Sequence, residues 1–259
     1  MRLSILARRS LIVIAAIVTA GSAMAQSADE KPIIERATLW TIKPGMGSKF
    51  EAGLKRHNQF HVKQGDTQSH DTYTIESGEN AGSYWRVASN RHWEDFDAEE
   101  KFGEADAADS DVNLSPYIES STPMFYEFLV DVSNPGPEDG PVAAMYELNF
   151  VKLKPGHYDQ FSLAMKKVKD AAVKVSWTEN WVWFVLVNGG EHEQFVLVLP
   201  RDNWADFNPP QKPFPKMLEE ALGKLEADAV FKMFDDSIAS NTSEIVRYRA
   251  DLSYTPARK

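Results

Sequence analysis

The chain has 259 residues, no cysteine, and 38 acidic against 28 basic residues. The absence of cysteine excludes disulfides, thiolate nucleophiles, cysteine metal ligands and a lipid anchor on a cysteine behind a signal. The acidic surface repels phosphate backbones and anionic lipid, so we expect no nucleic-acid partner and no membrane contact after signal cleavage.

The first 25 residues read as a secretory signal peptide. Three arginines precede a short apolar run over residues 11–20, and Ala23-Met24-Ala25 follows as a small-x-small cleavage site. The apolar run is much shorter than the roughly 20 residues of a spanning helix. We therefore predict that the mature chain begins at Gln26 and is periplasmic or secreted.

The remainder repeats itself at an offset of 111 residues, without a gap, from Ala37 to Phe96. Lys43-Pro44-Gly45 aligns with Lys154-Pro155-Gly156, and Gly78 aligns with Gly189. An ungapped register that keeps Gly, Pro and Trp in place indicates two copies of one unit.

Each copy reads as strand, helix, strand, strand, helix, strand. In the first copy we expect strands over residues 37–43, 71–77, 83–89 and 125–132, a helix over 47–64, a helix from about Trp93, and a loose loop over 105–113. In the second copy we expect strands over 145–154, 181–188, 194–199 and 245–253, and helices over 157–175 and about 215–239. The start of a calcium loop at Asp109 lacks the required glycine and glutamate, so we predict solvated loop there.

A Pro/Gly-rich stretch, residues 133–141, separates the copies and reads as a linker. The predicted domains are a signal over 1–25, repeat 1 over 26–132, the linker over 133–141 and repeat 2 over 142–259. The element order is that of a ferredoxin-like unit, whose bare sheet face must be covered. We predict an α+β fold in which two tandem units form an α/β barrel within one chain.

Tyr146-Glu147-Leu148, Leu153-Lys154-Pro155-Gly156 and the later Trp204-Ala205-Asp206-Phe207 resemble the NIPSNAP group of dimeric α/β-barrel proteins. That superfamily also contains antibiotic-biosynthesis-type and heme-degrading monooxygenases. The resemblance implies a pocket between the sheet and the helices of one unit, lined by alternate residues of the first strand. Those residues are Arg36, Thr38 and Trp40 in the first copy, and Glu147, Asn149 and Val151 in the second.

Asn149 falls where the heme-degrading relatives place a pocket asparagine. Those relatives also use a histidine on the second helix, and neither copy has a histidine after Trp93 or Trp204. We therefore expect no heme chemistry of that kind and assign no cofactor.

His57 and His61 are the sharpest local feature, because residues four apart on a helix share one face. Such a pair can share a metal ion, but no acidic residue follows at the spacing of a known metal motif. We predict a pocket-lining pair and no metal; the plain structural alternative is a helix edge or a pair of core histidines. Their counterparts, Val168 and Ala172, read as core. We expect His70 and His92 at the solvent-exposed ends of elements.

Arg36 and Arg86 are basic residues on otherwise neutral strands. Each can bind a carboxylate ligand or pair with Glu147 or Glu76, and we favour the pairing. The chain also has seven tryptophans, which either line an aromatic pocket or fill a core.

Three functions remain open at this point. The first is a small-molecule-binding protein of NIPSNAP-like type, a monomer or homodimer, that takes an aromatic or apolar ligand near Arg36, Thr38, Trp40, His57, His61 and Arg86. The second is a cofactor-independent monooxygenase for an aromatic or quinone-like substrate, with His57 or His61 as its acid/base. The third is a structural or interaction module without a ligand.

Overall fold

The computed structural model describes residues 31–137 and 142–256. The predicted signal peptide and residues 138–141 of the predicted linker lie outside the described residues. Ser133 and Asn134, at the start of that linker, hydrogen-bond to the second half of the chain: the Ser133 hydroxyl accepts from the Trp183 backbone N–H, and Asn134 forms a β-bridge with Trp181.

The described chain divides into two halves with the same order of strands. The N-terminal half contains β1 (Ile34–Ile42), α1 (Gly47–Gln64), β2 (Asp71–Ile75), β3 (Tyr84–Arg91), α2 (Trp93–Glu99), α3 (Gly103–Asn113) and β4 (Ile118–Phe128). The C-terminal half contains β5 (Met145–Leu153), α4 (Tyr158–Lys174), β6 (Val182–Asn188), β7 (Gln194–Arg201), α5 (Phe214–Leu222), α6 (Lys224–Ser237) and β8 (Ile238–Tyr248).

The strands form one closed barrel in the order β1-β3-β2-β8-β5-β7-β6-β4. Each half therefore contributes a sheet of ferredoxin-like order, β4-β1-β3-β2 or β8-β5-β7-β6, and antiparallel pairing of β2 with β8 and of β6 with β4 closes the barrel. Closure covers the sheet edges where β2 meets β8 and β6 meets β4, whereas the first parts of β4 and β8 pair on one side only. The predicted α+β fold, two ferredoxin-like units forming an intramolecular barrel, is confirmed.

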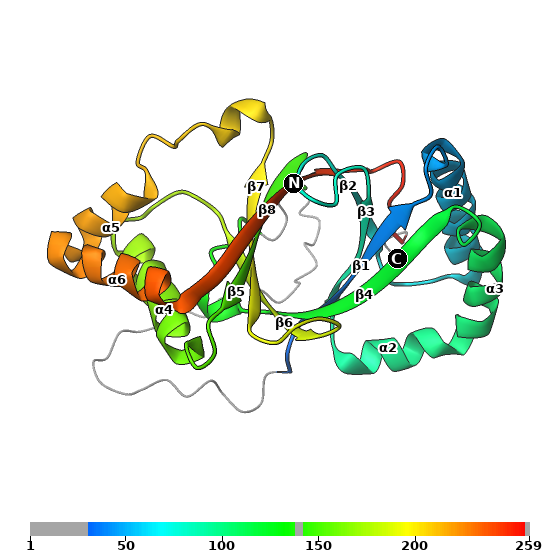
Figure 1. Ribbon diagram of the computed structural model, residues 1–259. Coiled ribbons are helices and arrows are strands. Elements are labelled where there is room, and N and C mark those ends of the chain that lie inside the picture. The colour runs from blue at the N-terminus through cyan, green and yellow to red at the C-terminus, as the bar shows by residue number, and fades with distance from the viewer. Residues whose placement is uncertain (1–30, 138–141, 257–259) are drawn as a thin grey trace, which may run out of the picture. The chain divides into compact units, whose positions relative to one another are not determined.

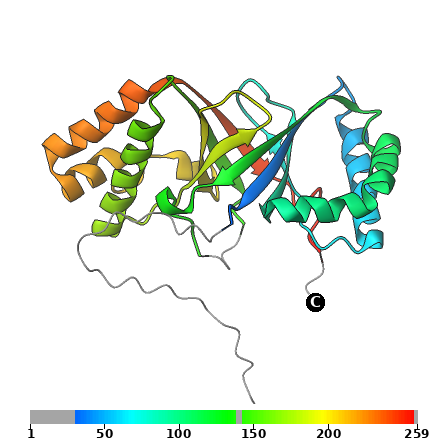
Figure 2. The same cartoon turned by 90° about the horizontal axis from the view of Figure 1, so that it is seen from below.

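Helices cover the outside of the barrel on two sides (Figures 1 and 2). Helices α1–α3 lie against the N-terminal sheet, and α4–α6 lie against the C-terminal sheet. Strand residues alternate between the barrel interior and the helix layer. On β5, for example, Leu148 and Phe150 pack in the interior, whereas Val151 and Leu153 pack under the helices.

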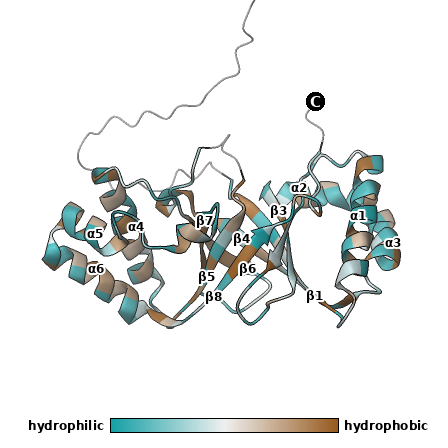
Figure 3. Ribbon diagram, turned by 90° about the horizontal axis from the view of Figure 1, so that it is seen from above, coloured by the Kyte–Doolittle hydropathy of each residue, from teal (hydrophilic) through white to brown (hydrophobic). Residues whose placement is uncertain are grey.

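The helix layer of the C-terminal half has a continuous apolar core. Phe161, Trp183 and Phe195 meet Met217 and Leu218 beneath the helices, and all five are buried. Val168 and Ala172 belong to the same core, as predicted. Figure 3 shows apolar brown on barrel strands such as β6, whereas α1 and α3 of the N-terminal half are largely teal.

The predicted closing strands are misplaced in both halves. β4 and β8 begin at Ile118 and Ile238, and both end at least four residues before the predicted ends. Their first parts, Glu119–Pro123 and Ala239–Ser243, are polar and exposed, so they show no apolar alternation. They are strands because their backbones pair with β1 and β5.

Two helix predictions are also corrected. The long helix predicted over 215–239 is two helices, because Gly223 adopts a φ of +80° between α5 and α6. The loose loop predicted over 105–113 is most of helix α3. Its alanines support a helix, and its aspartates do not prevent one on a partly exposed face. No helix among the described residues is long and apolar enough to cross a membrane.

Two aligned glycines sit where the halves meet. Gly78 follows β2 with a φ of +92°, and a Cβ there would lie 2.8 Å from the Ser243 carbonyl oxygen of β8. Gly189 follows β6 with a φ of +97°, and its Cβ would lie 2.6 Å from the Pro123 carbonyl oxygen of β4. Both seams of the barrel therefore require a residue without a side chain.

We expect Gly189→Ala to lower the free energy of unfolding by about 2–4 kcal/mol, because it combines left-handed strain with a clash against the β4 backbone. Gly45→Ala is the matched control. Gly45 has a φ of +74° but nothing within 4 Å of its Cβ position, so it should lose only about 1 kcal/mol. Urea unfolding of both variants measures the difference; equal losses would show that the seam is not tightly packed.

Candidate functional site

A cavity of about 750 Å³ lies between the sheet and the helices of the N-terminal half. Its walls come from β1, β3 and β4 and from the three helices that cover them. Every site residue predicted in this half lines it: Arg36, Thr38, Trp40, His57, His61 and Arg86. Glu147 and Asn149 lie in the other half, away from this cavity, and their role stays a prediction.

Helix α1 presents the histidines to the cavity because its buried face repeats every three or four residues. Phe50 and Leu54 anchor that face in a small apolar cluster, and His57 and His61 continue it over the next two turns. Gly65 then ends the helix in a left-handed conformation. The chain reverses there and places Asp66 beside His61.

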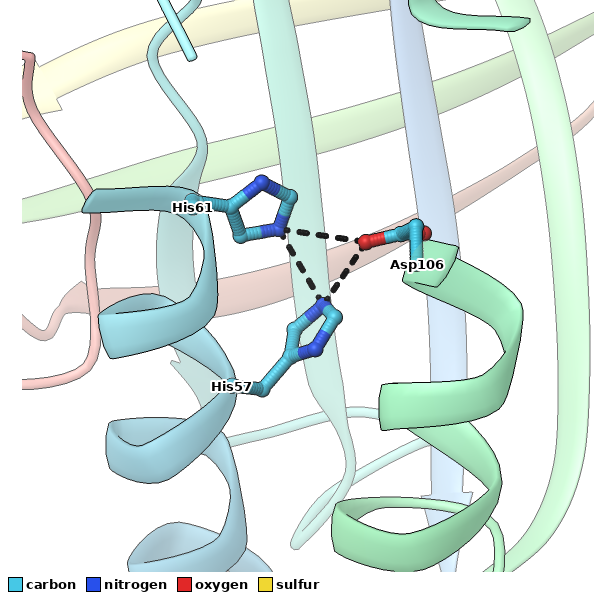
Figure 4. A group of neighbouring side chains, drawn as sticks. All are labelled: His57, His61 and Asp106. Carbon is cyan, nitrogen blue, oxygen red and sulfur yellow. Dashed lines mark hydrogen bonds and ion pairs between the residues drawn. The ribbon is translucent and has the colours of Figure 1, made fainter. Parts of the chain in front are cut away.

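Helix α3 supplies carboxylates from the opposite wall. Asp106 and Asp109 are three residues apart and therefore share a face of the helix. The helix approaches α1 closely, since a Cβ on Gly53 would lie 1.9 Å from the Asn113 carbonyl oxygen. Figure 4 shows Asp106 facing both imidazoles.

The two imidazoles face each other through their Nε2 atoms, which are 3.1 Å apart. Each Nε2 lies 3.6 Å from Asp106 Oδ1. On the far side of its ring, His57 Nδ1 is 2.9 Å from Asp109 Oδ2. Burial, partly opposed by Asp109, lowers the pKa of His57, so its ring is neutral near pH 7 and donates from Nδ1 to the carboxylate.

Asp66 joins His61 to a third histidine. His61 Nδ1 lies 3.0 Å from Asp66 Oδ2, within ion-pair distance but outside hydrogen-bond alignment, and His70 Nε2 donates to the same oxygen at 3.2 Å. Burial opposes ionisation of Asp66, but these histidines and the Gln68 backbone N–H hold its pKa well below the ordinary value. Burial lowers the pKa of His70 to about 3. His70 is thus buried beside the pair, and the expectation of an exposed His70 is wrong.

The arginines do not pair as predicted. Arg36 forms an ion pair with Glu99 of α2 at 2.8 Å, and Glu99 also pairs with the buried Arg91. Glu147 pairs instead with Arg201, and Glu76 pairs with Arg247. The partner of Arg36 is therefore Glu99 on α2, a helix whose position could not be predicted from the sequence.

Arg86 is a buried cation held by neutral oxygens. Its Nη1 donates to the carbonyl oxygens of His70 and Leu252 and to the Thr72 hydroxyl, and its Nη2 donates to Asn58 Oδ1. Burial lowers its pKa to about 9, so it stays charged at neutral pH. Arg86 thereby ties the segment after β8 to the wall of the cavity.

The cavity combines aromatic walls with an excess of carboxylates. Trp40, Phe96, Phe102 and Phe125 line it. Its acidic lining residues are Asp66, Glu99, Glu100, Asp106 and Glu119, against the two arginines Arg36 and Arg86. The lining carboxylates therefore outnumber the lining guanidinium groups, which disfavours anionic ligands.

Sequence reasoning missed the acidic half of the histidine cluster. Asp66 follows the helix-ending Gly65, and that glycine is the signal that could have placed it next to His61. Asp106 and Asp109 were assigned to a loop, although their spacing of three residues is the signature of one helix face. Helices α3 and α1 come into contact only in the folded chain, and no local sequence pattern predicts that contact.

No protein-family model matches this chain, and no curated protein matches it. Solved structures do match. A provisionally assigned monooxygenase from Lactobacillus acidophilus NCFM is 10% identical with a TM-score of 0.54, covering 88% of this chain and 98% of its own. An anthrone oxidase-like protein is 14% identical with a TM-score of 0.53, covering 90% and 97%. A chlorite dismutase variant from Candidatus Nitrospira defluvii is 8% identical with a TM-score of 0.54, covering 86% and 93%. At these identities the likeness shows the fold.

A second, smaller cavity of about 240 Å³ lies inside the barrel. Aromatic and branched residues from both halves line it, including Tyr73, Trp85 and Phe150. Glu35 is the one carboxylate among its lining residues. Burial, partly offset by a hydrogen bond from Ser89, raises the pKa of Glu35 to about 7.

Glu35 should make the fold less stable as pH rises. The unfolded chain releases this proton near pH 4.5, whereas the folded chain holds it until about pH 7, so the stabilisation is present below pH 4.5 and is lost between these values. A full shift corresponds to about 3 kcal/mol; because Glu35 borders a cavity, we expect about 2 kcal/mol. Glu35→Gln should remove this loss.

The measurement is urea unfolding of both proteins at pH 4.5, 6 and 8. The difference in unfolding free energy between Glu35→Gln and the wild type should grow with pH. A difference independent of pH would contradict the raised pKa. Burial also raises the pKa of the neighbouring Asp71. Because Asp71 titrates in both proteins, its contribution cancels when the two are compared.

Proposed function

We propose that this protein binds a small, aromatic-faced, uncharged or cationic molecule in the cavity of its N-terminal half. One observation carries the proposal. The two halves have the same strand order but differ in the space between sheet and helices. In the C-terminal half an apolar core fills that space, whereas in the N-terminal half a cavity of about 750 Å³ remains.

The cost of that open space supports a function for it. A packed core stabilises a half-barrel through buried apolar area. The N-terminal half instead buries His57, His61, Asp66, His70 and Arg86, and buried polar groups stabilise less than the apolar groups they replace. A convergent set of polar groups in a concave, aromatic-walled space is typical of a ligand site.

The same set of groups favours one class of ligand. The aromatic side chains offer flat apolar contact, while Arg36 is already neutralised by Glu99 and the remaining carboxylates repel a negative charge. A phenol or a quinone fits this lining better than an aromatic acid does. Such a ligand agrees with the sequence-based expectation of an aromatic or apolar molecule.

A cofactor-independent oxygenase is the second candidate, and the His57–Asp109 pair favours it. A neutral imidazole oriented by a carboxylate is a general base. In the balanced reaction an activated methylene loses a proton to His57, and with dioxygen as the oxidant it becomes a carbonyl with release of one water. Two of the matching structures carry the names monooxygenase and anthrone oxidase-like. Oxygen uptake with anthrone, lost in His57→Gln, would support this candidate; no uptake by the wild type would remove it.

Export, internal duplication and the NIPSNAP resemblance belong to the same proposal. They rest on the arginine-led signal, on the register that aligns Gly78 with Gly189, and on the strand that ends Leu153-Lys154-Pro155-Gly156. The intact mass of the exported protein tests the first. A chain that begins at Gln26 agrees with export, and a chain that keeps its first 25 residues contradicts it.

The matched pair 2-naphthol and 2-naphthoate tests the ligand class, because the two share a ring system and differ in charge. We expect 2-naphthol to bind the mature protein at least tenfold more tightly than 2-naphthoate. Thr38→Trp, which places an indole in the cavity, should weaken 2-naphthol binding at least tenfold. Isothermal titration calorimetry measures both effects.

Asn149→Trp is the control, because Asn149 is the aligned position in the C-terminal half. It should leave 2-naphthol binding unchanged, and circular dichroism checks that both variants fold. Equal weakening by the two variants, or tighter binding of 2-naphthoate, would contradict the proposed site.

A further inference from the structure

Three potential ligand atoms converge at one point of the cavity wall. They are the Nε2 atoms of His57 and His61 on α1 and Oδ1 of Asp106 on α3, and the distances between them are 3.1, 3.6 and 3.6 Å. Figure 4 shows all three atoms directed toward one another. The triangle lies on the cavity wall, since all three residues line the cavity.

These distances match the spacing around a tetrahedral metal ion. Zinc binds histidine nitrogen and carboxylate oxygen at about 2.0–2.2 Å, which places tetrahedral ligand atoms about 3.3–3.5 Å apart. Three protein ligands also leave the fourth position open. Because all three residues line the cavity, a ligand in the cavity could reach that open position.

Carboxylates on the far side of each ring favour the required tautomer. His57 Nδ1 donates to Asp109, and His61 Nδ1 lies beside Asp66. A proton held at Nδ1 leaves the lone pair on Nε2, which is the usual arrangement behind a metal-bound histidine. With both protons at Nδ1, two Nε2 lone pairs would face each other at 3.1 Å, and a cation between them would remove their repulsion.

The surroundings of Asp106 are a separate observation that points to a cation at this place. Its Oδ1 is a buried carboxylate oxygen with no hydrogen-bond donor among the described residues. The nearest cationic or donor groups recorded for it are the two imidazole Nε2 atoms. The Asp106 side chain as a whole is 34% exposed, but buried oxygens without a donor are rare, and a cation in the triangle would satisfy this one.

We propose that His57, His61 and Asp106 bind one divalent transition-metal ion, best matched by Zn²⁺, with its open position toward the cavity. The ion would be a Lewis acid facing whatever the cavity holds. This inference goes beyond the proposed ligand binding and does not depend on it, because the metal ligands all come from the chain. With the ion on its Nε2 and Asp109 at its Nδ1, His57 could not be the base of the second candidate function.

A second group of atoms competes for the same histidine. His61, Asp66 and His70 also lie close enough to share an ion. Asp66, however, is engaged by the Gln68 backbone N–H and by His70. Asp66 and His70 are therefore already hydrogen-bonded, although His61 Nδ1 has no hydrogen-bond partner among the described residues. The titration below distinguishes the two groups.

The test is titration of ZnCl₂ into the full mature protein, purified without a metal-affinity tag and stripped with chelator. We expect one equivalent of zinc to bind per chain. Asp106→Asn, which keeps the shape of the side chain, should weaken binding at least tenfold, and His57→Val should weaken it at least a hundredfold. Asp109→Asn should weaken it tenfold to a hundredfold, as expected for an outer partner of a metal-bound histidine.

Asp111→Asn, on the exposed part of the same helix, is the control and should leave zinc binding unchanged. Visible absorption of the Co²⁺ form should show the intense bands of a tetrahedral site. No binding by the wild type would overturn the proposal. Unchanged binding in Asp106→Asn, with loss in His70→Ala, would also overturn it and assign the ion to the competing group. No organic ligand is present, so failure here is distinct from failure of the ligand proposal.

Discussion

The N-terminal half depends on a pair of nearly perpendicular imidazoles whose Nε2 atoms meet. His57 and His61 are buried on α1, with their Nε2 atoms 3.1 Å apart and an aspartate behind each ring. An uncompensated buried polar group costs several kcal/mol, so the surrounding elements are arranged to supply partners. Helix α3 brings Asp106 and Asp109, the turn after α1 brings Asp66, and Tyr254 stacks on His61 from the chain end.

The two halves differ in packing because the N-terminal half has buried polar side chains where the C-terminal half has apolar core residues. In the C-terminal half the same two positions are Val168 and Ala172, and helices α4–α6 close over them. In the N-terminal half the apolar contact is restricted to a smaller cluster around Phe50 and Leu54, and α2 and α3 enclose a cavity. One barrel thus combines a half with a packed helix layer and a half that keeps a cavity of about 750 Å³.

Much of the fold was predictable because it depends on local patterns. Pro-Gly breaks, alternation along β1 and β5, and the aligned glycines at the seams all leave a trace in the sequence. The polar starts of β4 and β8 do not, because backbone pairing alone makes them strands. The sequence shows a glycine at position 223, but it does not show that the helix ends there, because a single glycine inside a helical pattern is often tolerated.

The site was predictable on one wall only. The family resemblance pointed to alternate residues of β1, and the spacing of His57 and His61 put both on one helix face; all of these side chains line the cavity. The opposite wall depends on α3 packing against Gly53, where Gly53 and Asn113 are sixty residues apart in the sequence. Charge pairing failed for the same reason: Glu99 reaches Arg36 through the path of α2, and no periodicity encodes that path.

The most direct test of this account is a crystal structure of the mature protein grown with Zn²⁺, with anomalous data collected at the zinc edge. We expect one strong peak about 2.0–2.2 Å from both Nε2 atoms and from Asp106 Oδ1, with the open side of the ion toward the cavity. A peak only at Asp66 and His70, only at exposed carboxylates, or at neither would contradict it. The facing imidazoles would then be a hydrogen-bonded element of the core.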